Sequence, residues 1–336
     1  MTTQPWSGPT DVDEATLRLG DELGSGGQGR VLRVTDHPGL AFKQYKVGGA
    51  DPAALKLLVD IPAQLQPADR DSLYAQTSWP LARVFNKGQL SGFLMQEIPG
   101  RFFGANSAGS KKLRELQYLV YPRKPLWGDI VPDAGVPAAT RVEVAREFTK
   151  LINTLHGRGL VLGDVSMSNV LWTGTDGGAV TIFVIDCDGI RKLGSRPVLP
   201  QADTLDWNDP HQPPSGPDLD TDRYKLALLV GRVLTMSPYI RPGDQLSLLS
   251  GVPDQAATRL SAHWQQAAGK YGTRPAASQW LMALSNRNDI PLQPWGKVRP
   301  RDPGLPQQEL EDPTASRPVI KVTPHGTGPL PRQTGP

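Results

Sequence analysis

Two aspartates follow the most strand-like stretch of the sequence. Residues 179–185 are rich in β-branched side chains and end directly before Asp186, and Asp188 follows two positions later. The pattern predicts a buried strand with a carboxylate at the point where the strand emerges. Carboxylate oxygens are the ligands that Mg²⁺ requires, so the turn is a candidate magnesium site. The alternative is a pair of aspartates that only caps the end of a strand.

A glycine-rich segment near the N-terminus could bind phosphate. Residues 24–31 read Gly-Ser-Gly-Gly-Gln-Gly-Arg-Val. A dinucleotide-binding loop would be followed by a helix, whereas residues 31–34 alternate as a strand and a Pro-Gly turn follows. The spacing therefore predicts a glycine loop within a hairpin, where backbone amides can close over phosphates. An ordinary glycine-rich turn is the alternative.

Lys43 lies on the strand predicted after this hairpin, between apolar neighbours. From that position its ammonium group could reach phosphate oxygens beneath the glycine loop. Most lysines on strands only face solvent, so the position relative to the loop is what makes Lys43 a candidate.

The elements that must position these residues change in type along the chain. Residues 16–95 favour an antiparallel sheet, interrupted by a helix over 52–65 that Pro62 should end or kink. Beyond Ala138, a capping box at 140–143 precedes apolar residues at helical spacing up to Leu155. A second helix, apolar on nearly every side, is predicted from Asp220 to Val230. The sequence therefore predicts an α+β protein.

One further stretch carries a resemblance to a known family. In Leu-Gly-Asp164-Val-Ser-Met-Ser-Asn169, the aspartate and the asparagine lie five residues apart in a loop predicted between a helix and a strand. It resembles the catalytic loop of the protein kinase superfamily, although such a pair is also frequent in turns. The resemblance implies that Asp164 accepts or orients the proton of the attacking hydroxyl, and that Asn169 and Asp186 hold Mg²⁺ or Mn²⁺. Lys43 is then the third catalytic residue.

The resemblance spans residues 17–284, with its motifs in the family's order. It implies ATP as cofactor, a gatekeeper at Met95 and a hinge for adenine over Gln96 to Ile98. The nucleotide-binding residues that it implies are Gly24, Gly26, Gly29, Val31, Ala41, Lys43, Met95, Gln96 and Ile98.

The same resemblance implies the domain organisation. We expect an N-terminal extension over 1–16 and a bilobal kinase-like domain over 17–290, in which 17–98 form the sheet-rich N-lobe with one main helix and 99–290 the mostly helical C-lobe. The tail, 291–336, holds 11 of the 33 prolines and is expected to be disordered. Asp222 should open the central helix in a structural role, and Arg274 and Trp280 should pack.

Several positions depart from the family's pattern. Leu162 and Gly163 stand where a histidine and an arginine usually precede the catalytic aspartate, so activity should not depend on a phosphorylated activation loop. Ser166 replaces a lysine that many serine/threonine kinases carry, which weakens the inference to a protein substrate. No glutamate is available to pair with Lys43, and Asp60 is the expected substitute.

These observations favour a magnesium-dependent serine/threonine protein kinase that transfers the γ-phosphate of ATP to a hydroxyl. Two alternatives stay open: a pseudokinase that binds nucleotide and acts as a regulatory scaffold, and a kinase of small molecules. The chain is similar to stand-alone bacterial kinases, which implies a metal-dependent protein phosphatase and a von Willebrand-type domain protein as partners.

Composition excludes other classes. With 36 basic and 33 acidic residues the net charge is +3, too even to indicate nucleic acid or an anionic membrane as partner. The single cysteine, Cys187, excludes an internal disulfide framework and a multi-cysteine zinc site. The first ten residues lack the pattern of a signal peptide, and we expect a cytoplasmic protein.

Overall fold

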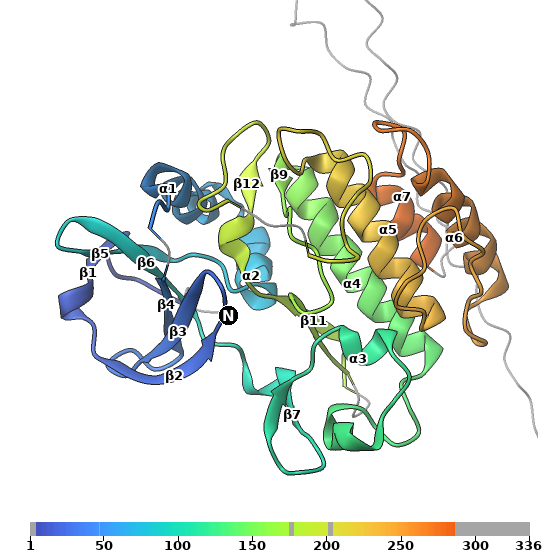
Figure 1. Ribbon diagram of the computed structural model, residues 1–336, viewed down its shortest axis with the longest axis horizontal. Coiled ribbons are helices and arrows are strands. Elements are labelled where there is room, and N and C mark those ends of the chain that lie inside the picture. Colours follow the sequence, from blue (N-terminus) through green and yellow to red (C-terminus); the bar gives the residue numbers. More distant parts are fainter. Residues whose placement is uncertain (1–4, 47, 175–177, 201–203, 286–336) are drawn as a thin grey trace, which may run out of the picture. The chain divides into compact units, whose positions relative to one another are not determined.

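The computed structural model describes residues 5–46, 48–174, 178–200 and 204–285 (Figure 1). The chain divides into two compact units, 1–289 and 290–336, and every described residue belongs to the first. The tail predicted over 291–336 lies outside the described residues. None of the described helices is long and apolar enough to cross a membrane.

The first part of the chain forms a six-stranded mixed sheet, in the order β1-β5-β6-β4-β3-β2. β1 pairs with β5 in parallel, and the other neighbours are antiparallel. The predicted strands are confirmed, but β1 comes from the segment that was expected to be an extension outside the domain. The strands are β1 (Asp11–Asp13), β2 (Leu19–Ser25), β3 (Gly29–Val34), β4 (Leu40–Tyr45), β5 (Ala82–Asn86) and β6 (Gln89–Gln96).

Two helices lie between β4 and β5. α1 (Pro52–Asp60) begins after Asp51, whose carboxylate accepts two N–H groups of the first turn. It ends before a 3-10 turn over 61–64 that contains Pro62, as expected from the missing N–H of proline. α2 (Pro67–Gln76) was not predicted, because it buries only two apolar side chains and shows little periodicity.

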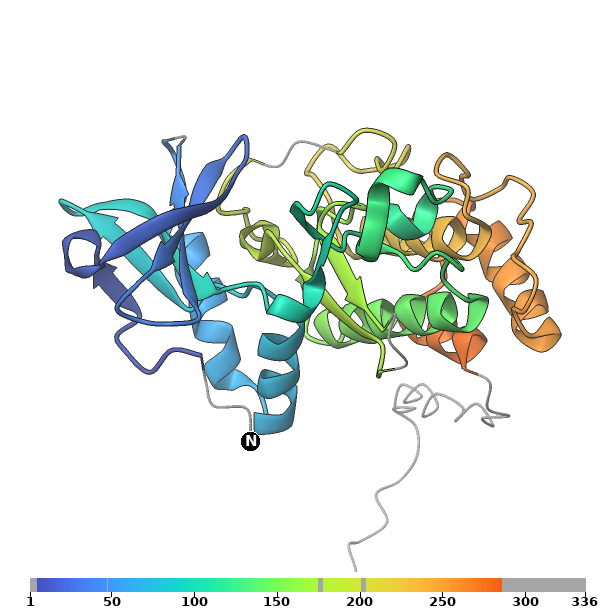
Figure 2. The same ribbon diagram turned by 90° about the horizontal axis from the view of Figure 1, so that it is seen from below.

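The second part of the chain is mostly helical, so the α+β class is confirmed (Figure 2). Its helices are α3 (Gln117–Val120), α4 (Ala138–His156), α5 (Leu219–Thr235), α6 (Asp254–Ala267) and α7 (Ala277–Leu284). This part also contains three two-stranded sheets. They are β7 (Phe103–Ala105) with β8 (Lys111–Leu113), β10 (Val170–Thr173) with β11 (Thr181–Val184), and β9 (Leu160–Val161) with β12 (Arg191–Lys192).

The capping box predicted for α4 is wrong, although the helix is present. α4 begins at Ala138, three residues earlier than that box implies, and Pro137 is its N-cap. Thr140 therefore lies inside the first turn and cannot cap it. The side chain of Arg141 explains part of the difference: it is buried and donates to the carbonyls of Leu119 and Val233, which packs the first turn of α4 against neighbouring segments.

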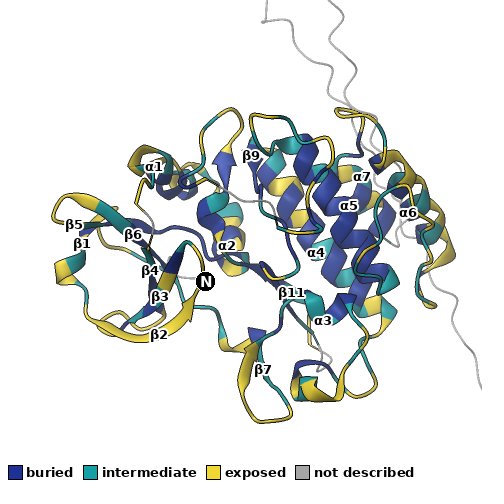
Figure 3. Cartoon of the chain, viewed as in Figure 1, coloured by how far each residue is buried: buried dark blue, intermediate teal, exposed yellow. Residues whose placement is uncertain are grey.

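α5 is buried along nearly its whole length, as predicted from its apolar composition (Figure 3). It packs against α4 on one side and α6 on another. Gly231 lets α5 approach Trp264 of α6 closely. A Cβ placed at Gly231 would lie 2.2 Å from the indole ring of Trp264. That indole is fixed by a 2.9 Å hydrogen bond from its Nε1–H to the carbonyl of Asp244.

We predict that Gly231→Ala lowers the free energy of unfolding by about 1–3 kcal/mol, because the added methyl group overpacks the contact with Trp264. The sign of the change in the free energy of unfolding is informative, since alanine in an exposed helix would instead stabilise the protein by about 1 kcal/mol relative to glycine. Urea denaturation measures the change. Combining the substitution with Trp264→Phe should recover part of the loss, and a simple sum of the two single effects would contradict this explanation.

Candidate functional site

Lys43 is a buried lysine with two carboxylates in contact. It lies on β4, its residue is only 5% exposed, and its Nζ is 2.6 Å from Oδ1 of Asp188 and 3.1 Å from Oδ1 of Asp186. The ring of Phe93, from the neighbouring strand β6, lies 5.7 Å from the ammonium. Burial alone would lower the pKa of Lys43, but the two carboxylates outweigh it and raise that pKa above its ordinary value.

The two aspartates differ in exposure. They follow β11, and Asp186 adopts a left-handed backbone conformation with φ of 59°. The side chain of Asp186 is 51% exposed, whereas that of Asp188 is 3% exposed. The second oxygen of Asp188 accepts a 3.2 Å hydrogen bond from the hydroxyl of Tyr45. Burial and the charge of Asp188 together raise the pKa of Tyr45, so this hydroxyl stays protonated and donates.

The prediction that Asp60 pairs with Lys43 is wrong. Asp60 lies at the end of α1 and pairs with Lys56 one turn earlier, at 2.6 Å. The local reason is the i,i+4 spacing, which brings the two side chains together on an exposed helix face. Asp188, buried beside the ammonium, takes the place that was expected for Asp60.

Cys187 anchors the turn between the two aspartates. Its thiol is buried, lies 3.4 Å from the carbonyl of Val184 and 3.8 Å from the hydroxyl of Ser78. Burial, assisted by the neighbouring carboxylates and opposed by Ser78, raises the pKa of the thiol to about 12. The side chain therefore fills the core as a small apolar group.

Asp164 and Asn169 hold each other across one loop between β9 and β10. The side-chain amide of Asn169 donates to the carboxylate of Asp164 at 2.9 Å and to its carbonyl at 3.2 Å. The carbonyl of Asn169 accepts from the N–H of Ile185 at 2.9 Å, directly before the Asp186 turn. One backbone hydrogen bond thus connects the two parts of the candidate site.

A buried carboxylate on α5 fixes the start of this loop. Asp222 is fully buried and accepts the N–H groups of Leu162 and Gly163 at 2.7 and 2.9 Å. Lys225, one turn later, donates to the carbonyl of Gly163 at 2.8 Å. The structural role expected for Asp222 is confirmed by these contacts.

Thr204 also belongs to the site, although no sequence pattern predicted it. Its hydroxyl donates to Oδ1 of Asp164 at 2.9 Å, across 40 residues of sequence. A threonine in an irregular segment has no local pattern that indicates such a contact. The contact shows that an alcohol oxygen reaches the Asp164 carboxylate.

The glycine loop joins β2 to β3, as predicted. Cβ atoms added at Gly24 and Gly26 would meet nothing within 4 Å, whereas one at Gly29 would lie 2.5 Å from the carbonyl of Gln44. Of these three loop glycines, only Gly29 is therefore required by packing within the chain. The N–H of Gly26 donates to the carbonyl of Gly29 and closes the turn.

The residues expected to surround adenine lie on three neighbouring strands. Val31 is opposite Lys43, and Ala41 is opposite Met95. Gln96 donates from its side chain to the carbonyls of Tyr74 and Thr77, and so fixes the end of β6 to the end of α2. Among the residues described, the N–H of Ile98 makes no backbone hydrogen bond and is free to donate to a ligand.

The protein itself offers few metal ligands. Within the described ranges, no group of three or more histidine, cysteine, aspartate or glutamate side chains is arranged to hold a metal. Asp188 is occupied by Lys43 and Tyr45, which leaves the exposed carboxylate of Asp186 and the amide oxygen of Asn169. A magnesium ion here would take its remaining ligands from phosphate and water, as is usual for this ion with nucleotides.

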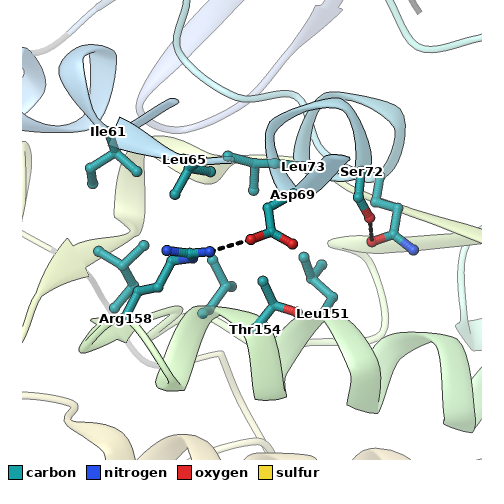
Figure 4. A pocket seen from close by; sticks show the side chains of 11 residues that line it. Ile61, Leu65, Asp69, Ser72, Leu73, Leu151, Thr154 and Arg158 are labelled. Atoms are coloured by element: carbon teal, nitrogen blue, oxygen red, sulfur yellow. Dashed lines mark hydrogen bonds and ion pairs between the residues drawn. The ribbon is translucent and has the colours of Figure 1, made fainter. Parts of the chain in front are cut away.

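Two pockets in the described part of the chain are lined by residues other than the candidate ones. One lies between α2 and α4, where Asp69 pairs with Arg158 above a floor that includes Leu151 (Figure 4). Its volume of about 20 Å³ holds no more than a water molecule. The other, of about 330 Å³, lies beside the start of α4.

The thiol of Cys187 reports whether the turn stays closed. We predict that iodoacetamide alkylates the native chain on the order of a thousandfold more slowly than the urea-unfolded chain at pH 8, because a thiol with a pKa near 12 is almost entirely protonated there. The native rate should rise with pH towards 12. Mass spectrometry measures the single label, and equal rates in both states would mean that the turn is open.

Comparison of the sequence with protein-family models and with curated proteins found no match. Function is therefore argued from the residues and their geometry.

Proposed function

We propose that this protein is a magnesium-dependent phosphotransferase with a bilobal kinase-like fold, which transfers the γ-phosphate of ATP to a serine or threonine hydroxyl of a protein. The observation that carries the proposal is the contact of Lys43 with Asp186. The two residues lie 143 positions apart and come from two motifs that the resemblance requires to meet at the phosphates. Nothing in the local sequence around either residue dictates this contact.

The phosphate end of the site would be formed by the sheet. Lys43 provides a fixed positive charge, and its raised pKa keeps it charged throughout the neutral range. Glycines at positions 24 and 26, which no internal contact requires, leave room for backbone N–H groups to approach phosphate oxygens. The free N–H of Ile98 would donate to the adenine ring.

The metal end of the site fits magnesium in its chemistry. Asp186 presents an exposed carboxylate, and Asn169 presents an amide oxygen from the adjoining loop. Both are hard oxygen donors. When bound, the metal ion would neutralise charge on the phosphates; the residues of the chain orient and hold it.

Asp164 is the candidate that positions the acceptor. Asn169 fixes one of its oxygens, and the other accepts a hydrogen bond from the Thr204 hydroxyl. An acceptor hydroxyl would replace Thr204 at the same oxygen, at the hydrogen-bond distance that proton transfer needs. Catalysis would then consist mainly of alignment and charge neutralisation.

The experiment is transfer of labelled γ-phosphate from ATP with Mg²⁺ or Mn²⁺, using generic proteins, the chain itself and candidate metabolites as parallel acceptors. We predict that Asp164→Ala lowers the rate by about 10²- to 10⁴-fold, the usual contribution of a general base. Asp186→Ala should lose transfer together with metal dependence, and chelation of the metal should stop the parent.

Asp60→Ala is the matched control, because Asp60 is an exposed helix carboxylate paired only with Lys56. It should transfer at the parental rate. Label on metabolites alone would favour the small-molecule kinase, and ATP binding without transfer would favour the nucleotide-binding scaffold. Neither binding nor transfer would refute the proposal.

A further inference from the structure

We propose that Asp188 is the positioning residue of Lys43: it takes the place of a helix carboxylate, and it leaves Asp186 free for metal. The catalytic consequence rests on the proposed function, whereas the ion pair itself does not. Two aspartates separated by one residue would then have different roles, one as a permanent partner of the lysine and the other as an exchangeable ligand.

The helices between β4 and β5 offer no partner for Lys43. Residues 46–81 contain four aspartates and no glutamate. Each aspartate is engaged elsewhere: Asp51 caps α1, Asp60 pairs with Lys56, Asp69 pairs with Arg158, and Asp71 lies 3.9 Å from Arg70. The sequence of this segment therefore supplies no carboxylate that reaches the ammonium.

Burial separates the roles of the two aspartates. Asp188 is almost wholly buried and has both oxygens bound, one by Lys43 and one by Tyr45. A buried carboxylate without its cation is strongly destabilising, so this pair is held for as long as the fold is. Asp186 is half exposed and lies 3.1 Å from the same ammonium. Water, and therefore a hydrated cation, can reach it.

The charge balance also requires a second carboxylate. A divalent cation that binds Asp186 competes with Lys43 for its negative charge. If Asp186 were the only partner, the buried ammonium would then lack a counter-ion from the protein, a costly state. Asp188 keeps Lys43 charged and fixed while Asp186 changes its partner. Both carboxylates lie in one turn, which Cys187 anchors to the core.

A consequence is that Lys43 is held without any contribution from α1 or α2. The turn after β11 supplies both the metal ligand and the lysine partner. The two carboxylates that contact the ammonium are then placed by three consecutive residues, 186–188, instead of by a helix.

The first test is independent of catalysis. Asp188→Asn should accelerate amine labelling of Lys43 at pH 8.5 by about tenfold, because Lys43 loses the charge of the buried carboxylate that lies 2.6 Å from its Nζ and holds it in place. Acetic anhydride at limiting concentration, with quantification by peptide mass spectrometry, gives the rate. Asp60→Asn is the matched control and should label at the parental rate.

Asp186→Asn is the second variant. Because the side chain of Asp186 is half exposed, this variant should fold even if Asp188→Asn does not. It should change the labelling rate of Lys43 less than threefold, because Asp188 still holds the ammonium. Faster labelling in Asp186→Asn than in Asp188→Asn, or a tenfold acceleration in Asp186→Asn alone, would overturn the proposal.

The second test measures phosphate transfer by the parent and by the two variants. Asp188→Asn should lower kcat/KM for ATP by about 10- to 100-fold, the effect of one hydrogen bond to a charged group, without changing the Mg²⁺ concentration at half-saturation. Asp186→Asn should raise that concentration. An equal shift in both variants would make Asp188 a metal ligand and refute the division of roles. A parent without transfer would refute the proposed function, and the labelling rates would still decide whether Asp188 holds Lys43.

Discussion

The ammonium of Lys43 is the charge on which the arrangement of the candidate site depends. An ammonium that is 5% exposed costs several kcal/mol unless carboxylates compensate it. The two that do so come from the turn after β11, more than 140 residues away. The sheet and the helical part of the chain are therefore tied together at the point where phosphates would be bound, and the cost of breaking that tie is electrostatic.

Two further buried carboxylates extend the same principle through the second half of the chain. Asp222 holds the loop before Asp164 by two backbone N–H groups, and Asp209 forms a bidentate pair with Arg274, with distances of 2.6 and 2.7 Å. Arg274, expected to pack, does so as one half of a buried ion pair. Removing one partner of such a pair is strongly destabilising, because it leaves a buried charge without compensation.

Local sequence patterns predicted the helices and strands better than they predicted the contacts between distant residues. The apolar run that became α5 and the strand before Asp186 were both readable, because periodicity and β-branched content are properties of neighbours in sequence. Asp188 was predicted only as the second carboxylate of a candidate magnesium turn, since its partner Lys43 lies on a distant strand. Thr204 was missed for the same reason. The predictions for α2 and for the start of α4 failed for a different reason. Tertiary packing fixed the limits of these helices, where the local sequence signals were weak or misleading.

The loop that carries Asp164 and Asn169 is fixed without a charged side chain at the two positions before Asp164. Gly163, which directly precedes Asp164, has no side chain, so this position offers no donor to a phosphate on another segment; the side chain of Leu162 is buried. The loop is held instead from behind, through the backbone, by Asp222 and Lys225 of α5. These contacts exist without any added charge. The orientation of Asp164 is therefore a property of the folded core.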